Sequence, residues 1–230
     1  MPHRLALPIE TRYLNADERL RDPAHVLESL LRDGGAPGQS EQGKHGRCLA
    51  SVARLVAWAD EQRGGLDLDP EEFARPEFAG GEHAVFLDRD TGRLVKITKP
   101  GMLGAQAEDA GAYLERWALA NRVFGDDVRF EGVVRMPGED EPRVVISQSF
   151  VEGRDATMEE QADYLRSRGF VEYDGRWVHP VLAVAVWDTL TPGNVIVQPD
   201  GAMWAVDLQI EPARSEELRA VQGRRVFSFQ

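Results

Sequence analysis

The sequence predicts an α+β fold in which helices come first and strands dominate later. Apolar residues recur with the helical period before about residue 75, and they alternate with the strand period from about residue 76. At two places, Asp90-Thr91-Gly92 and Pro199-Asp200-Gly201, a tight-turn sequence is flanked on both sides by alternating apolar and polar residues. This pattern is typical of β-hairpins. Strands and helices do not alternate regularly, so we expect an α+β arrangement rather than a doubly wound sheet.

The composition is that of a globular protein with an acidic surface. The 230 residues carry a formal net charge of −12, and 42% of them are hydrophobic. Such a charge opposes binding to nucleic acids in general and to anionic membranes. A single cysteine, Cys48, excludes an internal disulfide and a cysteine-based zinc site. The segment MPHRLALPIE lacks the apolar core of a signal peptide, and no apolar run approaches the ~20 residues of a membrane span, so we expect a cytoplasmic protein.

Two amphipathic helices are predicted before residue 75. The first begins at Asp22-Pro23, where an N-capping side chain precedes a proline in the first turn, and it ends before Gly34-Gly35. A polar, glycine-rich stretch from Asp33 to Gly46 predicts a loop, and the second helix covers about residues 47–62. The apolar positions of the two helices are Val26, Leu27, Leu30 and Leu31, and Leu49, Val52, Val56 and Ala59.

The later elements follow from residue period and turn residues. A hairpin covers AVFLDRDTGRLVKIT, and a helix covers residues 107–124. Thr157 and Glu160 form a capping box that begins a helix ending at Gly169. The other predicted strands are VRFEGVVR, RVVISQSF, VLAVAVW and the hairpin NVIVQPDGAMWAVDLQI. The buried side of the helix over 107–124 is expected to carry Tyr113, Leu114, Trp117 and Ala120.

The first candidate site residues lie in the first hairpin. Arginine supplies almost all of the positive charge, and lysine occurs only at positions 44, 96 and 99. Lys96 stands among apolar neighbours on a strand, where its ammonium group either reaches solvent or meets an anion. Gly80-Gly81 precede this hairpin, and glycines there let backbone N–H groups approach phosphate oxygens.

A helix packed against the hairpin could bring a carboxylate to Lys96. Glu115 follows Lys96 by nineteen residues, and Glu108 is its competitor on the same predicted helix. A carboxylate–ammonium pair would direct the lysine towards a phosphate. An exposed helix charge is the other interpretation of Glu115.

The strongest candidate segment runs from Asp188 to Asp207. Asn194 and Asp207 are thirteen residues apart, at the two ends of the second predicted hairpin, whose strands would bring them side by side. Amide and carboxylate oxygens are ligands that suit Mg²⁺. Asp188 follows a buried strand and could accept the proton of a substrate hydroxyl. Turn formation is the alternative role of Asp188 and Asn194.

Together these residues resemble the site of the protein-kinase-like fold in type, order and spacing. More closely, the chain is similar to the compact bacterial and phage polyvalent protein-kinase family over about residues 76–210. The stretches that carry the likeness are GGEHAVFLDRDTGRLVKITKPG, YLERWALANRVFGDDVRFEGVV, RVVISQSFVEGRDATMEEQADYLRSRGF and TPGNVIVQPDGAMWAVDLQI. The resemblance implies a two-lobed domain, with lobes of about 76–150 and 151–230, which follows the helical extension that the residue period predicts over 1–75. It also suggests a phage or mobile-element setting.

The resemblance implies ATP as a cofactor and gives roles to the residues of the first lobe. Lys96 would contact the ATP phosphates, Glu115 would orient Lys96, and Gly80 and Gly81 would cover the phosphates. The stretch Ser147-Gln148-Ser149-Phe150 would form the hinge beside the adenine. This position makes Gln148 and Phe150 candidates for nucleotide binding.

In the second lobe the resemblance implies Mg²⁺ and a phosphoryl-transfer reaction. Asn194 and Asp207 would hold the metal, and Asp188 would be the catalytic base. The implied activity is transfer of the γ-phosphoryl group to a hydroxyl, with a serine or threonine of a protein as the expected acceptor.

The chain departs from the kinase pattern at three points, which leave other functions open. No G-x-G-x-x-G occurs, Trp187 stands before Asp188 in place of an H-R-D sequence, and Asp188 precedes Asn194 by six positions, one more than in kinases. Counted back from Asn194, the base position falls on Thr189 unless the loop bulges. The alternatives are a pseudokinase-type nucleotide-binding module, a small-molecule phosphotransferase and a nucleotidyl transferase.

Overall fold

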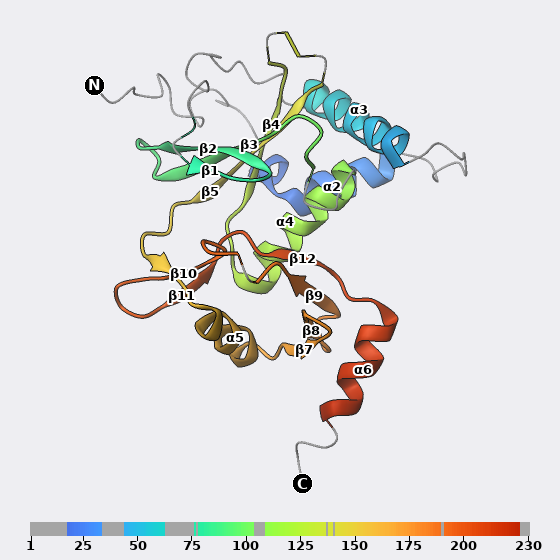
Figure 1. Ribbon diagram of the computed structural model, residues 1–230. Helices are drawn as coiled ribbons and strands as arrows, with labels where there is room; N and C mark the ends of the chain where they lie inside the picture. Colours follow the sequence, from blue (N-terminus) through green and yellow to red (C-terminus); the bar gives the residue numbers. More distant parts are fainter. Residues whose placement is uncertain are drawn as a thin grey trace. The chain divides into compact units, whose positions relative to one another are not determined.

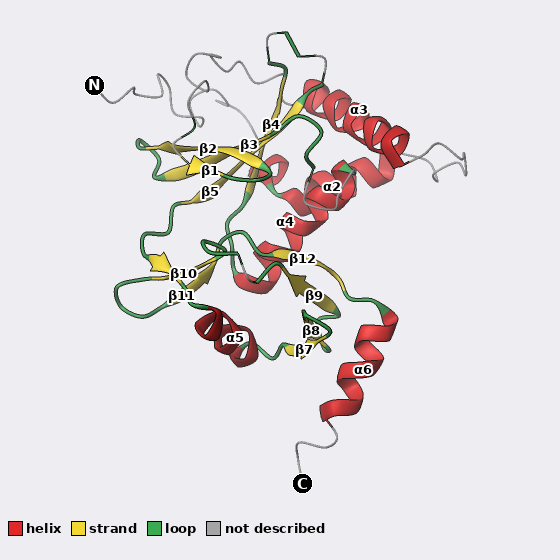
Figure 2. Ribbon diagram, viewed as in Figure 1, coloured by secondary structure: helices red, strands yellow, loops and turns green. Residues whose placement is uncertain are grey.

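The computed structural model describes residues 18–33, 44–62, 76, 78–103, 109–136, 138–139, 141–189 and 191–225. These residues form five α-helices and three antiparallel sheets, which confirms the predicted α+β class (Figures 1 and 2). The chain divides into two compact units. The first comprises Met1–Ala118 and Asp127–Phe150, and the second comprises Leu119–Asp126 and Val151–Gln230.

A five-stranded antiparallel sheet organises the first unit, in the order β1-β2-β3-β5-β4. Its strands are β1 (Phe78–Ala79), β2 (His83–Asp88), β3 (Arg93–Thr98), β4 (Arg129–Val134) and β5 (Arg143–Ser149). β2 and β3 form the predicted hairpin, and the carboxylate of Asp88 stabilises its turn by accepting from the Asp90 backbone N–H at 3.0 Å. A core cluster on this sheet contains Phe86, Val95, Ile97, Val134 and Val145.

The N-terminal elements η1 (Glu18–Arg21), α2 (Pro23–Asp33) and α3 (Lys44–Gln62) each contact β4. Asp22 caps α2 as predicted, because its Oδ1 atom accepts from the Ala24 backbone N–H at 3.0 Å. α3 begins at Lys44, earlier than predicted, so the expected loop through Gly46 is too long. Leu31 is 68% exposed, which removes it from the buried stripe, whereas Val26 is fully buried. The side chains of Cys48 and Leu49 lie outside the described residues, as do residues 34–43.

Helix α4 (Ala110–Phe124) carries the four buried residues expected of it, Tyr113, Leu114, Trp117 and Ala120. It starts later than the predicted residue 107. Asp109 provides the reason, because its Oδ1 accepts from the Gly111 backbone N–H at 2.6 Å and so caps the helix. Residues 104–108, including Glu108, lie outside the described residues.

The second unit contains two small sheets and two helices. One sheet has the order β11-β10-β6 and the other β12-β9-β8-β7. The strands are β6 (Arg154–Asp155), β7 (Val171–Tyr173), β8 (Arg176–His179), β9 (Val184–Trp187), β10 (Val195–Val197), β11 (Met203–Ala205) and β12 (Gln209–Pro212). Helix α5 (Met158–Ser167) begins with the predicted capping box, and α6 (Ser215–Arg225) follows β12. Hydrogen bonds from Arg154 and from the Thr157 backbone lower the pKa of Glu160 in this box to about 2.

The prediction of a buried strand over VLAVAVW is wrong for the first half of that segment. Val181 is 74% exposed, and only Val184–Trp187 form β9. The chain turns before β9 because His179 Nδ1 accepts from the Val181 and Leu182 backbone N–H groups, and Ala183 has a φ of +53°. The β7–β8 hairpin was not predicted, although the Asp-Gly pair at 174–175 is a hairpin signal.

Candidate functional site

Lys96 lies on β3 with its side chain inside the first unit. The residue is 5% exposed, and its Nζ atom is 5.2 Å from the centroid of the Trp117 ring on α4. A cation at this distance over an aromatic face is held electrostatically. The strand therefore directs the ammonium group to the face of the sheet that meets α4, away from bulk water.

Arg116, next to the candidate Glu115, forms an ion pair that links α4 to Glu82, the residue before β2. Its Nη1 atom lies 2.7 Å from Glu82 Oε2, and its guanidinium carbon lies 4.2 Å from the Trp117 ring centroid. Glu115 is half-buried on the same helix, and its pairing with Lys96 stays a prediction. Sequence reasoning missed Arg116, because nothing in the local sequence marks Glu82 as its partner.

A second contact joins the same helix to the start of β2. The Tyr113 hydroxyl and His83 Nε2 are 2.8 Å apart, and both side chains are buried. The contact lies beside the Gly80-Gly81 turn. Lys99 holds this turn from the end of β3, since its backbone N–H donates to Glu82 O at 2.9 Å and its Nζ donates to Gly80 O.

In the predicted hinge, Ser147–Phe150, the last two backbone N–H groups are already hydrogen-bonded within the protein. The Ser149 N–H donates to Asp127 Oδ1 at 2.8 Å, and the Phe150 N–H donates to Gly92 O at 3.0 Å. Gln148 between them is 3% exposed, and its Oε1 atom is buried with no hydrogen-bond donor among the described residues. A buried amide oxygen without a donor is unusual and points to a missing partner.

Gln148 shares a sheet face with Lys96. Lys96 is paired with Ile146, and Leu94 is paired with Gln148. Paired residues of antiparallel strands point to the same face, and residues two apart on one strand do so as well. The buried amide and the buried ammonium therefore lie on one face of the first unit's sheet.

In the second unit, Asn194 holds Asp188. The Nδ2 atom of Asn194 donates to the Asp188 backbone oxygen at 2.9 Å and to its carboxylate Oδ2 at 3.2 Å. The Thr191 hydroxyl donates to the other carboxylate oxygen. Asp188 has a φ of +64°, a left-handed conformation that aspartate tolerates better than most residues. Both bonds use the Nδ2 atom of Asn194, and its Oδ1 atom accepts no hydrogen bond from the described residues.

The backbone of the β10–β11 hairpin brings Asn194 to the start of the Asp207 segment. Val195 pairs with Ala205, and the Val206 backbone N–H donates to Asn194 O at 2.9 Å. Asp207 follows directly and is half-buried. The two ends of the hairpin therefore lie together, as the turn at Pro199-Asp200-Gly201 predicts.

Comparison with known proteins identifies the chain. A family model described as "Serine/Threonine/Tyrosine Kinase found in polyvalent proteins" matches residues 50–212. The chain belongs to this kinase family. The resemblance inferred from the sequence is thereby confirmed. No curated protein and no solved structure matches the chain.

Membership of the polyvalent kinase family suggests a phosphotransferase that uses ATP and binds a nucleotide and a substrate. The matched region includes the candidates of both units, from Gly80 to Asp207, and begins after η1 and α2. Of the helices in the described part of the chain, none combines the length and apolar character that crossing a bilayer requires.

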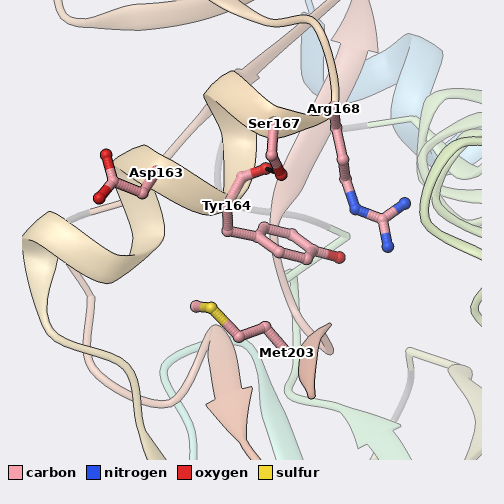
Figure 3. A pocket seen from close by; sticks show the side chains of 5 residues that line it. All are labelled: Asp163, Tyr164, Ser167, Arg168 and Met203. Atoms are coloured by element: carbon pink, nitrogen blue, oxygen red, sulfur yellow. Dashed lines mark hydrogen bonds between the residues drawn. The ribbon is translucent and has the colours of Figure 1, made fainter. Parts of the chain in front are cut away.

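A shallow depression in the second unit contains none of these candidates. Figure 3 shows its lining, with Asp163, Tyr164 and Ser167 in the C-terminal half of α5, Arg168 directly after the helix, and Met203 on β11. The Arg168 guanidinium carbon is 4.6 Å from the Tyr164 ring centroid. Burial raises the pKa of the Tyr164 phenol. The Arg168 guanidinium therefore stacks on the Tyr164 ring at this surface, and none of the residues predicted for kinase chemistry lines the depression.

Proposed function

We propose that the protein is a Mg²⁺-dependent kinase that transfers the γ-phosphoryl group of ATP to a serine or threonine hydroxyl of a protein. The observation that carries this proposal is the Asn194–Asp188 interaction. A carboxylate oriented by an amide, at the end of a buried strand, is suited to accept a proton from a bound hydroxyl. The positive φ at Asp188 and its hydrogen bonds with Asn194 support Asp188 rather than Thr189 as the base.

Asn194 and Asp207 fit a Mg²⁺ ion. Asn194 presents an amide oxygen without a donor among the described residues. Asp207 supplies a carboxylate two residues after the end of β11, next to the backbone contact between Val206 and Asn194. In the described part of the chain, no group of three His, Cys, Asp or Glu side chains could hold a metal by itself. Two protein ligands completed by phosphates and water are the usual arrangement for Mg²⁺. A bound ion would neutralise charge on the phosphates.

The chain's own residues would share the remaining work. Lys96 would bind phosphate oxygens of ATP, supported by Glu115, and Gly80-Gly81 would cover them. Asp188 would take the proton from the acceptor hydroxyl as its oxygen bonds to the γ-phosphorus and ADP leaves. Gln148 and Phe150 would contact the base.

The test is a transfer assay on the full chain with Mg²⁺ and ATP labelled at either the γ- or the α-phosphate. Transfer of the γ-label to protein acceptors or to the chain itself supports the proposal. Asp207→Ala should reduce this transfer by about 10²-fold or more. Transfer of the α-label indicates a nucleotidyl transferase. Nucleotide binding without transfer of either label supports the pseudokinase alternative. Transfer restricted to small hydroxyl compounds supports the small-molecule phosphotransferase.

A further inference from the structure

A series of hydrogen-bonded polar side chains, buried at the η1 end and more exposed at the hinge end, connects η1 to the predicted hinge. Arg21, the last residue of η1, is 5% exposed, and Glu131 on β4 is fully buried. The Nη2 atom of Arg21 lies 2.7 and 2.8 Å from the two carboxylate oxygens of Glu131. Glu131 needs such a partner, because an unpaired charge in a protein interior is strongly unfavourable.

Ser147 of β5 joins this ion pair to a second one. Its hydroxyl donates to Glu131 Oε1 at 2.6 Å and accepts from Arg93 Nε at 2.8 Å. The Arg93 guanidinium continues to Asp127, with Nη1 2.6 Å from the carboxylate and Nη2 2.8 Å from the backbone oxygen. Hydrogen bonds to charged groups are stronger than those between neutral groups. The Ser147 hydroxyl makes two of them, one to Glu131 and one to Arg93, and so has a fixed position.

The series ends on the backbone of the hinge. Asp127 accepts from the Ser149 N–H at 2.8 Å and from the Ser149 hydroxyl at 2.6 Å. The next residue, Phe150, donates to Gly92 O, one position before Arg93. The position of residues 147–150 is therefore set by side chains from η1, β3, β4 and the loop before β4.

We propose that Arg21 is a positioning residue for nucleotide binding, which acts through Glu131 and Ser147 on the hinge segment. The inference rests on the proposed function, in which this segment contacts the nucleotide base. Among the described residues, Arg21 and Ser147 are the groups that bond the Glu131 carboxylate. Without Arg21, the charge of Glu131 would attract Arg93, the cation that bonds the Ser147 hydroxyl. Arg93 would then hold Asp127, and with it Ser149, less firmly.

With this role, η1 takes part in nucleotide binding through Arg21. Arg21 lies outside the residues 50–212 that the kinase family model matches. The ion pair bridges 110 positions of the chain, so the N-terminal segment is tied directly to β4, which pairs with the strand that carries the hinge residues.

The test measures ADP affinity by titration calorimetry in the full chain. Arg21→Met removes the charge and keeps a long side chain, and Ser147→Ala removes the link between the two ion pairs. Both should weaken ADP binding about tenfold, because small displacements of positioning groups are costly. Val26→Ala is the matched control, since Val26 is fully buried in the adjacent α2 and takes no part in the series. It should lower the melting temperature and change the affinity by no more than about twofold.

A double variant separates charge from packing. Arg21→Met with Glu131→Gln removes the uncompensated charge, while the amide oxygen at position 131 can still accept from Ser147, so ADP affinity should recover most of the loss. If Arg21→Met and Ser147→Ala bind ADP as tightly as the wild type, or if Val26→Ala loses as much, the proposal is overturned. Should Arg21→Met not fold, Ser147→Ala and the double variant decide. A wild type that binds neither ADP nor ATP contradicts the proposed function itself, which is a different result.

Discussion

The side-chain amide of Asn194 donates to the backbone oxygen of Asp188 at 2.9 Å and to its carboxylate at 3.2 Å. The loop between them has one residue more than the kinase pattern. Asp188 adopts a left-handed backbone conformation with a φ of +64°, which lets its side chain turn back to Asn194. Asp188 is therefore hydrogen-bonded to Asn194 although the sequence between them has one residue more than in kinases.

This interaction makes a prediction about the base. Asp188→Asn should lower kcat by about 10²–10⁴-fold, because the proton acceptor is lost while the left-handed turn is kept. Thr189→Val should leave kcat close to the wild-type value. Steady-state phosphotransfer assays on the two variants check this. Loss in Thr189→Val together with retained activity in Asp188→Asn would assign the base position to Thr189.

Lys96→Met should reduce kcat/KM for ATP by about 10²-fold or more, because a buried ammonium group that stabilises phosphate charge would be lost. The substitution keeps an unbranched side chain against Trp117, so folding should be retained. Arg166→Met is a control that removes one positive charge from an exposed ion pair with Asp163. Equal activity of Lys96→Met and Arg166→Met would remove Lys96 from the phosphate site.

Gln148→Leu should weaken ADP binding by about tenfold and reduce the preference for ADP over GDP, because its buried amide has donor and acceptor atoms for a base edge. Leucine has a similar volume and suits the buried position. Calorimetric titration with ADP and GDP measures both quantities. An unchanged ADP-to-GDP ratio in a folded variant would show that this side chain does not contact the base.

The Arg116–Glu82 pair predicts a large stability effect. Arg116 is buried and Glu82 is mostly covered, with side-chain exposed fractions of 5% and 11%. Arg116→Met leaves Glu82 without this partner and should lower the free energy of unfolding by about 3 kcal/mol. Arg166→Met, in an exposed pair, should change it by less than about 1 kcal/mol. Urea unfolding of both variants gives the comparison, and equal losses would contradict the burial argument.

The Asp127 carboxyl predicts a loss of stability at low pH. Partial burial raises its pKa, but hydrogen bonds from the Ser149 side chain and backbone and from Arg93 outweigh this effect, so its pKa lies below the usual 3.8. A lowered pKa in the folded state means that the stabilisation is present above pH 3.8 and is lost as the pH falls through the folded-state value. The stability difference between wild type and Asp127→Asn should therefore shrink below pH 3.8. Urea unfolding at several pH values measures it, and a constant difference would be inconsistent with the lowered pKa.

Much of the secondary structure could be predicted because its signals are local. The Asp90-Thr91-Gly92 turn, the Asp22 cap and the Thr157–Glu160 capping box each depend on residues a few positions apart. The exposed segment before β9 could not be predicted, because VLAVAVW has the composition of a buried strand along its whole length. The bonds to His179 decide where that strand begins.

The candidate site residues were found from the sequence because kinase chemistry needs fixed residue types in a fixed order. Lys96, Glu115, Asp188, Asn194 and Asp207 stand in that order within the matched family region. Their roles stay predictions until the variants above are measured.

By itself, the sequence determined the fold class, the family and the expected chemistry of individual residues, because each depends on local patterns or on residue order. Only the tertiary structure decided which charges are buried and paired. Arg21 and Glu131 are 110 positions apart, and Arg116 and Glu82 are 34 apart. The free energy of a buried charge depends on the group that meets it in space, and residue order along the chain does not specify that group.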